Sequence, residues 1–230
     1  DVNALAAFED PTMGAPRIVC SIDDSTKVHL FDPVAGGKAL LVIDVGSDVY
    51  ALMAFADPTT GALQLTCAGK DGRVRVFDPV AGGEALIVLE GHTDDVRALT
   101  AFTDPATGGP RLVSGSDDST VRVWNPAAGG AAIEAEPKGH YSKVSALVTF
   151  VDPATSALRV ATGSRGEICV WDADTGGMLL VHKIGDCSYS LASTALEVFA
   201  DPATGAPLLA CARTQSVSYT HLTLPTNCVV

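Results

Sequence analysis

The sequence predicts an all-β protein in which one unit of about 47 residues is repeated along the chain. The motif Phe-x-Asp-Pro occurs five times, with steps of 47, 47, 48 and 49 residues. A second marker follows in the first four units, where an apolar segment ends in Phe-Asp, Trp-Asn or Trp-Asp. The segments between these markers are short and rich in β-branched residues, which is typical of strands. The motif aspartates are Asp10, Asp57, Asp104, Asp152 and Asp201.

The third unit shows the expected elements most clearly. Apolar segments at 96–102, 112–115 and 121–124 are followed by a weaker one at 131–135, which predicts four strands. The Asp-Pro-Ala-Thr-Gly loop suits a tight turn, because proline presets φ, the aspartate side chain can bond the backbone ahead, and glycine permits a positive φ. We therefore expect the first and second strands, and the third and fourth, to form hairpins.

A four-stranded sheet of this size cannot cover both of its apolar faces alone, so the copies must stack. Radial stacking predicts a β-propeller. The units run over about 1–47, 48–94, 95–142 and 143–188, with a partial unit at 189–214. We expect four blades and part of a fifth, forming an open arc.

The most complete unit resembles the WD-repeat family. It runs from Gly91-His92 through the segment SGSDDSTVRVWN, which ends at Asn125, and the resemblance extends over residues 1 to about 214. Propellers of this family most often have seven blades, so the resemblance implies that the open arc is part of a larger, seven-bladed propeller. The resemblance implies a hydrogen-bonded chain of four side chains in this unit, namely His92, Ser114, Asp118 and Trp124. Such a chain would satisfy a buried indole and a buried imidazole together.

The other units depart from that pattern. The fourth keeps His140, Thr162 and Trp171 but shortens the turn and has Arg165 where the aspartate would lie, so we expect an incomplete network there. The second unit has valine, cysteine and phenylalanine in place of the histidine, serine and tryptophan, so we expect apolar packing to replace hydrogen bonding. Those residues are Val45, Cys67 and Phe77, with Asp71 kept.

One position of the repeat is always small and weakly polar. Cys20, Cys67, Ser114, Thr162 and Cys211 occupy it in five successive units. Equivalent positions on neighbouring blades should lie too far apart for a disulfide, so we interpret these cysteines as buried structural thiols. The six cysteines contain no Cys-x-x-Cys pair and the histidines show no metal-ligand spacing, so we expect no metal and no cofactor.

Both ends of the chain depart from the repeat. The first residues match the middle of a unit, and the fifth unit stops after its second strand, so we expect an internal fragment of a longer protein. Residues 216–227, SVSYTHLTLPTN, resemble a translated sequencing adapter. We therefore expect 215–230 to be a non-native or disordered tail outside the fold.

The composition narrows the class of partner. The formal net charge of −12 disfavours nucleic acid and anionic membranes, whereas basic proteins or peptides are compatible with it. No apolar run approaches the roughly 20 residues of a membrane helix. The six cysteines do not show the spacing of a disulfide-rich small domain, which suggests a reducing compartment, the cytoplasm or the nucleus.

In the WD-repeat family, partner contacts concentrate three and five residues after the histidine and just before the turn aspartate. By this resemblance, one rim carries the candidate partner-binding residues, formed by the loops that enter each unit and those that join its second and third strands. These candidates are Asn3, Asp23, Asp48, Tyr50, Lys70, Asp95, Arg97, Asp117, Lys143 and Ser145. We expect a non-enzymatic scaffold that binds peptides or folded proteins on this rim.

Two enzyme interpretations compete with the scaffold. The chain could be the substrate-recognition domain of a larger enzyme such as a ubiquitin ligase, which would require a catalytic domain elsewhere. It could also be a propeller hydrolase using His92, Ser114 and Asp118 as a triad. The second interpretation is disfavoured, because no Gly-x-Ser-x-Gly elbow is present and no oxyanion-hole donors can be named. The aspartates of the Asp-Pro loops could bind a cation, but turn capping is the favoured role.

Overall fold

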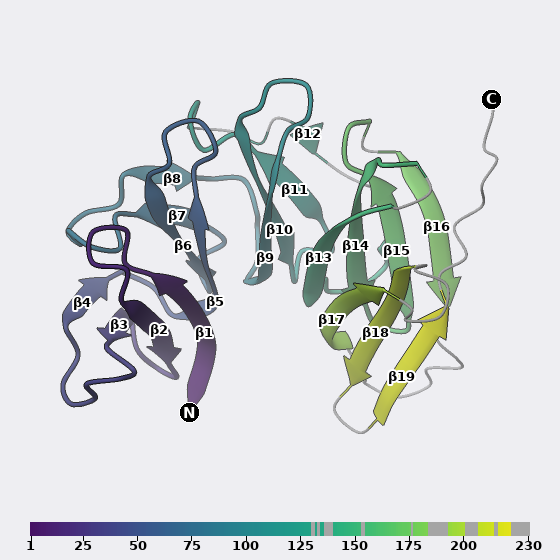
Figure 1. Ribbon diagram of the computed structural model, residues 1–230. Coiled ribbons are helices and arrows are strands. Elements are labelled where there is room, and N and C mark those ends of the chain that lie inside the picture. Colours follow the sequence, from purple (N-terminus) through teal and green to yellow (C-terminus); the bar gives the residue numbers. More distant parts are fainter. Residues whose placement is uncertain are drawn as a thin grey trace.

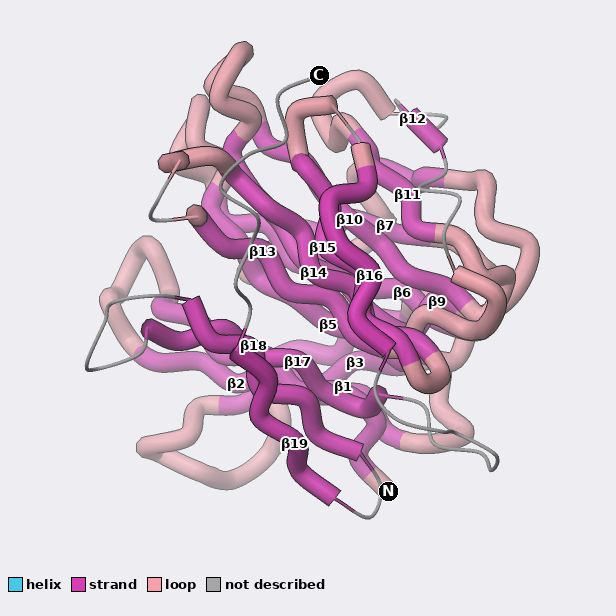
Figure 2. The backbone as a smooth tube through the Cα atoms, turned by 90° about the vertical axis from the view of Figure 1, so that its right-hand side faces the viewer, coloured by secondary structure: helices cyan, strands magenta, loops and turns pink. Residues whose placement is uncertain are grey.

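The computed structural model describes residues 1–129, 132, 134–135, 140–152, 155–175, 177–183, 193–200, 207–213 and 216–221. Over these residues the chain forms strands joined by short loops and contains no helix, as Figures 1 and 2 show. It therefore has no described helix that could cross a membrane. The all-β prediction is confirmed.

The strands form five separate antiparallel sheets, four with four strands and the last with three (Figure 1). In each sheet the strands follow chain order, so each strand pairs with the next one along the chain. The strands are, in order, β1 (Val2–Glu9), β2 (Pro16–Ile22), β3 (Lys27–Phe31), β4 (Leu41–Asp44), β5 (Val49–Ala56), β6 (Leu63–Gly69), β7 (Val74–Phe77), β8 (Ile87–Leu89), β9 (Val96–Thr103), β10 (Pro110–Ser116), β11 (Val121–Trp124), β12 (Glu134–Ala135), β13 (Ala146–Val151), β14 (Leu158–Ser164), β15 (Glu167–Asp172), β16 (Met178–Lys183), β17 (Ser193–Ala200), β18 (Pro207–Arg213) and β19 (Ser216–His221).

The Asp-Pro loops form the predicted turns between the first and second strands. Asp10 Oδ1 accepts the backbone N–H of Thr12 at 2.9 Å and also its hydroxyl at 2.6 Å. Asp57 repeats both contacts with Thr59, and Gly61 closes that turn with a φ of +71°. The aspartate therefore caps the turn, which explains why the motif recurs with the period of the fold. Asp201 lies outside the described residues.

The core lies between the sheets. Four buried clusters each join two neighbouring sheets, and the first strands β1, β5, β9, β13 and β17 contact one another in sequence. Each apolar face is thus covered by the next repeat, as the stacking argument requires. Among the described strands none of the first sheet pairs with the fifth, so the sheets form an open arc of blades.

The second repeat replaces the expected hydrogen bonds by apolar packing. Val45, Cys67 and Phe77 are all buried in the cluster between the first two sheets. Asp71 lies outside this cluster and pairs with Arg75, with 2.6 Å between the Oδ2 and Nη2 atoms. Cys20, Cys67, Cys169 and Cys211 form no disulfide; Cys20 is only half-buried, whereas the other three are buried. Burial raises the pKa of Cys67 well above its ordinary value.

The C-terminal segment differs from the expectation. Ser216–His221 forms β19, which pairs antiparallel with β18 from Arg213 opposite Ser216 to Leu208 opposite His221. The segment is therefore not outside the fold. An unpaired edge of β18 offers a row of free N–H and C=O groups, and Val217, Tyr219 and Thr220 are good strand formers. Residues 222–230 lie outside the described part of the chain.

Candidate functional site

The four side chains that the family resemblance selects in the third repeat form one hydrogen-bonded chain. Trp124 Nε1 donates to Ser114 Oγ at 2.8 Å, and the same oxygen lies 2.7 Å from His92 Nε2. His92 Nδ1 lies 2.9 Å from Asp118 Oδ2. Since the Asp118 carboxylate can only accept, Nδ1 of the neutral imidazole carries the proton and donates to it, and Nε2 accepts the hydroxyl proton of Ser114. The chain links β10, β11 and the loop before β9.

The electrostatics of this chain follow from burial. Burial lowers the pKa of His92, so the imidazole is neutral near pH 7 despite its contact with Asp118. Burial alone would raise the pKa of Asp118, but hydrogen bonds from Thr120, the Thr93 amide and His92 lower it to about 2. His92 is therefore a neutral imidazole that donates to the ionised carboxylate of Asp118. This contact orients the imidazole ring and fixes the turn between β10 and β11.

The same geometry disfavours a hydrolase. Ser114 is fully buried, with an exposed fraction of 0%, and its oxygen is already shared by Trp124 and His92. A substrate carbonyl has no approach to this atom in the folded chain. The arrangement therefore holds β10, β11 and the loop before β9 together instead of presenting a nucleophile.

The fourth repeat contains a complete network, which corrects the expectation of an incomplete one. His140 Nε2 lies 2.6 Å from Thr162 Oγ1, which accepts the Trp171 indole N–H at 2.8 Å. His140 Nδ1 lies 3.0 Å from Glu167 Oε1, so a glutamate takes the place of the aspartate. The shorter turn starts β15 one residue earlier, and the longer side chain of Glu167 reaches the imidazole from the strand. Arg165 is exposed and takes no part.

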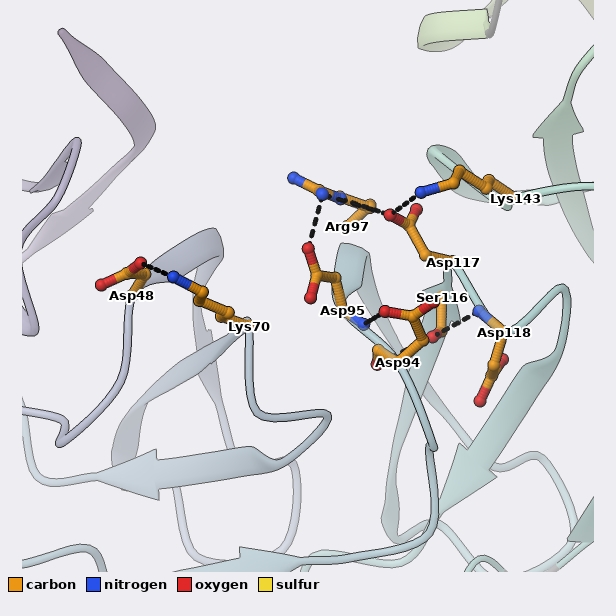
Figure 3. A network of polar contacts seen from close by, with 9 residues as sticks. All are labelled: Asp48, Lys70, Asp94, Asp95, Arg97, Ser116, Asp117, Asp118 and Lys143. Atoms are coloured by element: carbon orange, nitrogen blue, oxygen red, sulfur yellow. Dashed lines mark hydrogen bonds and ion pairs between the residues drawn. The ribbon is translucent and has the colours of Figure 1, made fainter.

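The rim residues of the third repeat form an ion-pair network with the fourth repeat (Figure 3). Arg97 Nη2 lies 2.6 Å from Asp95 Oδ2 and 3.1 Å from Asp117 Oδ2. Lys143 Nζ reaches Asp117 Oδ2 at 2.6 Å, so the two cations share one carboxylate whose side chain is only 4% exposed. Arg97 also lies over the ring of Tyr50, with 4.2 Å from Cζ to the ring centroid, which extends the contacts to the second repeat.

In each of the first three repeats, one backbone hydrogen bond sets the rim residues side by side. The amide of the residue before the turn aspartate donates to a carbonyl in the loop that enters the first strand. Asp117 N donates to Asp95 O at 2.8 Å, and Lys70 N donates to Asp48 O at 3.0 Å. Lys70 Nζ then pairs with Asp48 Oδ2 at 3.1 Å, as Figure 3 shows. The rim positions therefore come together through the fold itself.

The remaining predicted rim residues are placed less centrally. Asn3 is half-buried on β1, and its side-chain nitrogen is buried without a hydrogen-bond partner. Asp23 is exposed, and its amide donates to Asp1 O at 2.8 Å. Ser145 is half-buried, and its amide donates to Gly163 O at 3.0 Å. The carboxylates of Asp94, Asp95 and Asp117 lie close enough together to form a cation site. Arg97 and Lys143, however, already pair with Asp95 and Asp117.

The comparison with protein families agrees with this geometry. The model for the WD domain, G-beta repeat, matches residues 83–125, which contain the whole hydrogen-bonded chain of the third repeat. By this match the third repeat is a WD repeat, in agreement with the resemblance seen in the sequence. No match was found among curated proteins. WD repeats generally mediate protein–protein interactions, and WD domains are typically non-catalytic.

A further set of side chains that recurs between repeats was missed at the level of the sequence. Arg17 is buried and pairs with both repeat markers, with 3.4 Å to Asp10 Oδ2 and 3.1 Å to Asp32 Oδ2. Arg159 joins Asp152 and Asp172 in the same way in the fourth repeat. The sequence does contain a signal for these arginines, because each lies three residues before the small, weakly polar position of its repeat.

Proposed function

We propose that this WD-repeat protein is an interaction scaffold and that the charged rim of the second to fourth repeats contacts a protein or peptide partner. The observation that supports it is the continuous set of contacts from Tyr50 through Arg97 and Asp117 to Lys143. Three repeats contribute to one surface whose charges are held in place before any partner arrives. Such preorganisation reduces the entropy lost on binding.

The residue types suit protein recognition. Arg97 and Tyr50 are of the kinds that dominate binding energies at protein interfaces, and their stacked arrangement offers a planar surface. The ammonium groups of Lys70 and Lys143 project from the rim, with side chains 63% and 61% exposed. The net charge of −12 favours encounter with basic partners, and the paired rim charges supply specificity.

The experiment removes rim charges without disturbing buried ones. Arg97 is kept, because its guanidinium continues to pair with the buried carboxylate of Asp117 when Lys143 is replaced. We would therefore compare Lys70→Gln/Lys143→Gln with Lys38→Gln, an exposed lysine in the loop between β3 and β4. Partners captured by the wild-type protein would be identified, purified and titrated against each variant.

We expect the double rim variant to bind about fivefold or more weakly, corresponding to about 1 kcal/mol, and the control to bind as the wild type does. The melting temperatures of all three should agree closely, because exposed ion pairs contribute little stability. Equal affinities of the rim variant and the wild type for every captured partner would refute the assignment of this rim.

A further inference from the structure

We propose that the fourth repeat contains a binding site for a borderline divalent cation such as Zn²⁺, formed by His140, Glu167 and Cys169. Glu167 Oε1 lies 3.0 Å from His140 Nδ1, and Cys169 Sγ lies 3.9 Å from the same nitrogen. All three donor atoms lie within 4.8 Å of one another. Imidazole nitrogen, carboxylate oxygen and thiolate sulfur are each ligands that Zn²⁺ takes in proteins.

The separations suit tetrahedral coordination. With metal bonds of about 2.0 Å to nitrogen and oxygen and about 2.3 Å to sulfur, the N···O and N···S distances would be about 3.3 and about 3.5 Å. The observed 3.0 and 3.9 Å differ from these by less than half an ångström. Rotation of the Glu167 and Cys169 side chains is sufficient to make up this difference.

The donor set arises from the changes that distinguish this repeat. The shortened turn brings Glu167 to the start of β15, and Cys169 follows two residues later, so both side chains lie on one face of the strand. The position of Cys169 is occupied by Arg122 in the third repeat and by Arg75 in the second. A guanidinium there would repel a cation. Of the first four repeats, this one alone combines the three donors.

The surrounding hydrogen bonds can serve both the empty and the occupied site. Thr162 Oγ1 lies 2.6 Å from His140 Nε2 and 3.3 Å from the carbonyl oxygen of Cys169. Without metal, the hydroxyl donates to Nε2 and Nδ1–H donates to Glu167. When Nδ1 binds a cation, the ring proton resides on Nε2 and donates to Thr162, whose own proton turns to the carbonyl. No buried polar group loses its partner, and the imidazole is held by a second contact as in known metal sites.

The charges also balance. The Cys169 thiol releases one proton to solvent on binding, and the thiolate and the Glu167 carboxylate together neutralise the two charges of the cation. A neutral assembly suits this setting, since the side chain of His140 is 0% exposed and Cys169 is fully buried. The Glu167 side chain, 11% exposed, lies nearest to solvent and leaves the fourth position to water. The sulfur donor disfavours Mg²⁺ and Ca²⁺.

The test is a Co²⁺ titration of the full chain, kept reduced with a phosphine. We expect one equivalent to produce a sulfur-to-cobalt charge-transfer band with visible bands of four-coordinate cobalt, and Zn²⁺ to displace it. Cys169→Ser should abolish the charge-transfer band, whereas the matched control Cys20→Ser should keep it. Circular dichroism would establish that each variant is folded.

A second variant makes the test independent of the thiol. Glu167→Gln keeps an oxygen that accepts the Nδ1 proton but removes the negative ligand, so the network should persist while the Kd for Co²⁺ rises tenfold or more. Absence of the band in the wild-type protein would overturn the proposal. So would a band that survives in Cys169→Ser, or an unchanged Kd in Glu167→Gln.

Discussion

The hydroxyl of Ser114 is the atom whose removal tests the hydrogen-bonded chain most directly. Ser114→Ala deletes one oxygen and adds no bulk, so the backbone of β10 has no reason to move. The loss leaves two buried groups without partners, the indole N–H of Trp124 and Nε2 of His92. Trp124 is fully buried and His92 is 7% exposed, so water has little access to replace the missing contacts.

The expected magnitude follows from these two groups. An unsatisfied buried donor or acceptor costs about 1–3 kcal/mol, so the variant should lose about 3 kcal/mol of unfolding free energy. The second repeat supplies the control, because it fills the same positions with Val45, Cys67 and Phe77. The triple variant His92→Val/Ser114→Cys/Trp124→Phe removes the polar groups together with their partners and should be less destabilised than Ser114→Ala.

The assay is urea-induced unfolding followed by circular dichroism, with hydrogen exchange of the β10 and β11 amides as the local measurement. The local measurement matters because repeat arrays need not unfold in one step. A loss below about 1 kcal/mol in Ser114→Ala would refute the reasoning. A triple variant more destabilised than the single one would show that shape, and not unpaired polarity, dominates at this position.

Three further predictions concern stability. Trp124→Ala should cost about 3–5 kcal/mol in urea unfolding, through the cavity it leaves and the lost hydrogen bond from the indole to Ser114. Asp118→Ala should cost less, because one link of the chain is lost, and the reverse order of the two variants would contradict the hydrogen-bonded chain. Burial lowers the pKa of His92, so its contribution to stability is complete above about pH 6.5 and is lost as the pH falls below that value. The urea midpoint should therefore drop on acidification from pH 7.5 to 5.5, and a rise would exclude a neutral imidazole. Arg17→Gln copies the residue of the second repeat and should lower the melting temperature by a few degrees, whereas an unchanged value would show that this buried pairing adds nothing.

The period and the elements of the repeat could be predicted from the sequence because local chemistry determines them. Asp-Pro turns and β-branched runs placed β9, β10 and β11 within one or two residues. The partners of Trp124 in the third repeat followed from the family resemblance. Glu167 could not be found in the same way, because a one-residue deletion shifts the alignment and an acid from the following strand takes the role.

Contacts between repeats were less accessible to sequence reasoning. The rim residues were named one by one, but the sharing of Asp117 by Arg97 and Lys143 depends on the distance between two sheets. No spacing along the chain encodes that distance. The pairing of β19 with β18 was missed for a similar reason, since an open sheet edge accepts a segment that carries no repeat marker.

The separation of the five sheets has a mechanical consequence. Strand-to-strand hydrogen bonds run within each sheet, whereas apolar clusters between buried side chains join one sheet to the next. A tension applied to the two ends would act first on these seams, and then on one hairpin after another as each blade is unravelled. Every blade that yields would release about 47 residues, or about 160 Å of extended chain. The protein would thus behave as a serial extensible tether, lengthening in steps of one repeat.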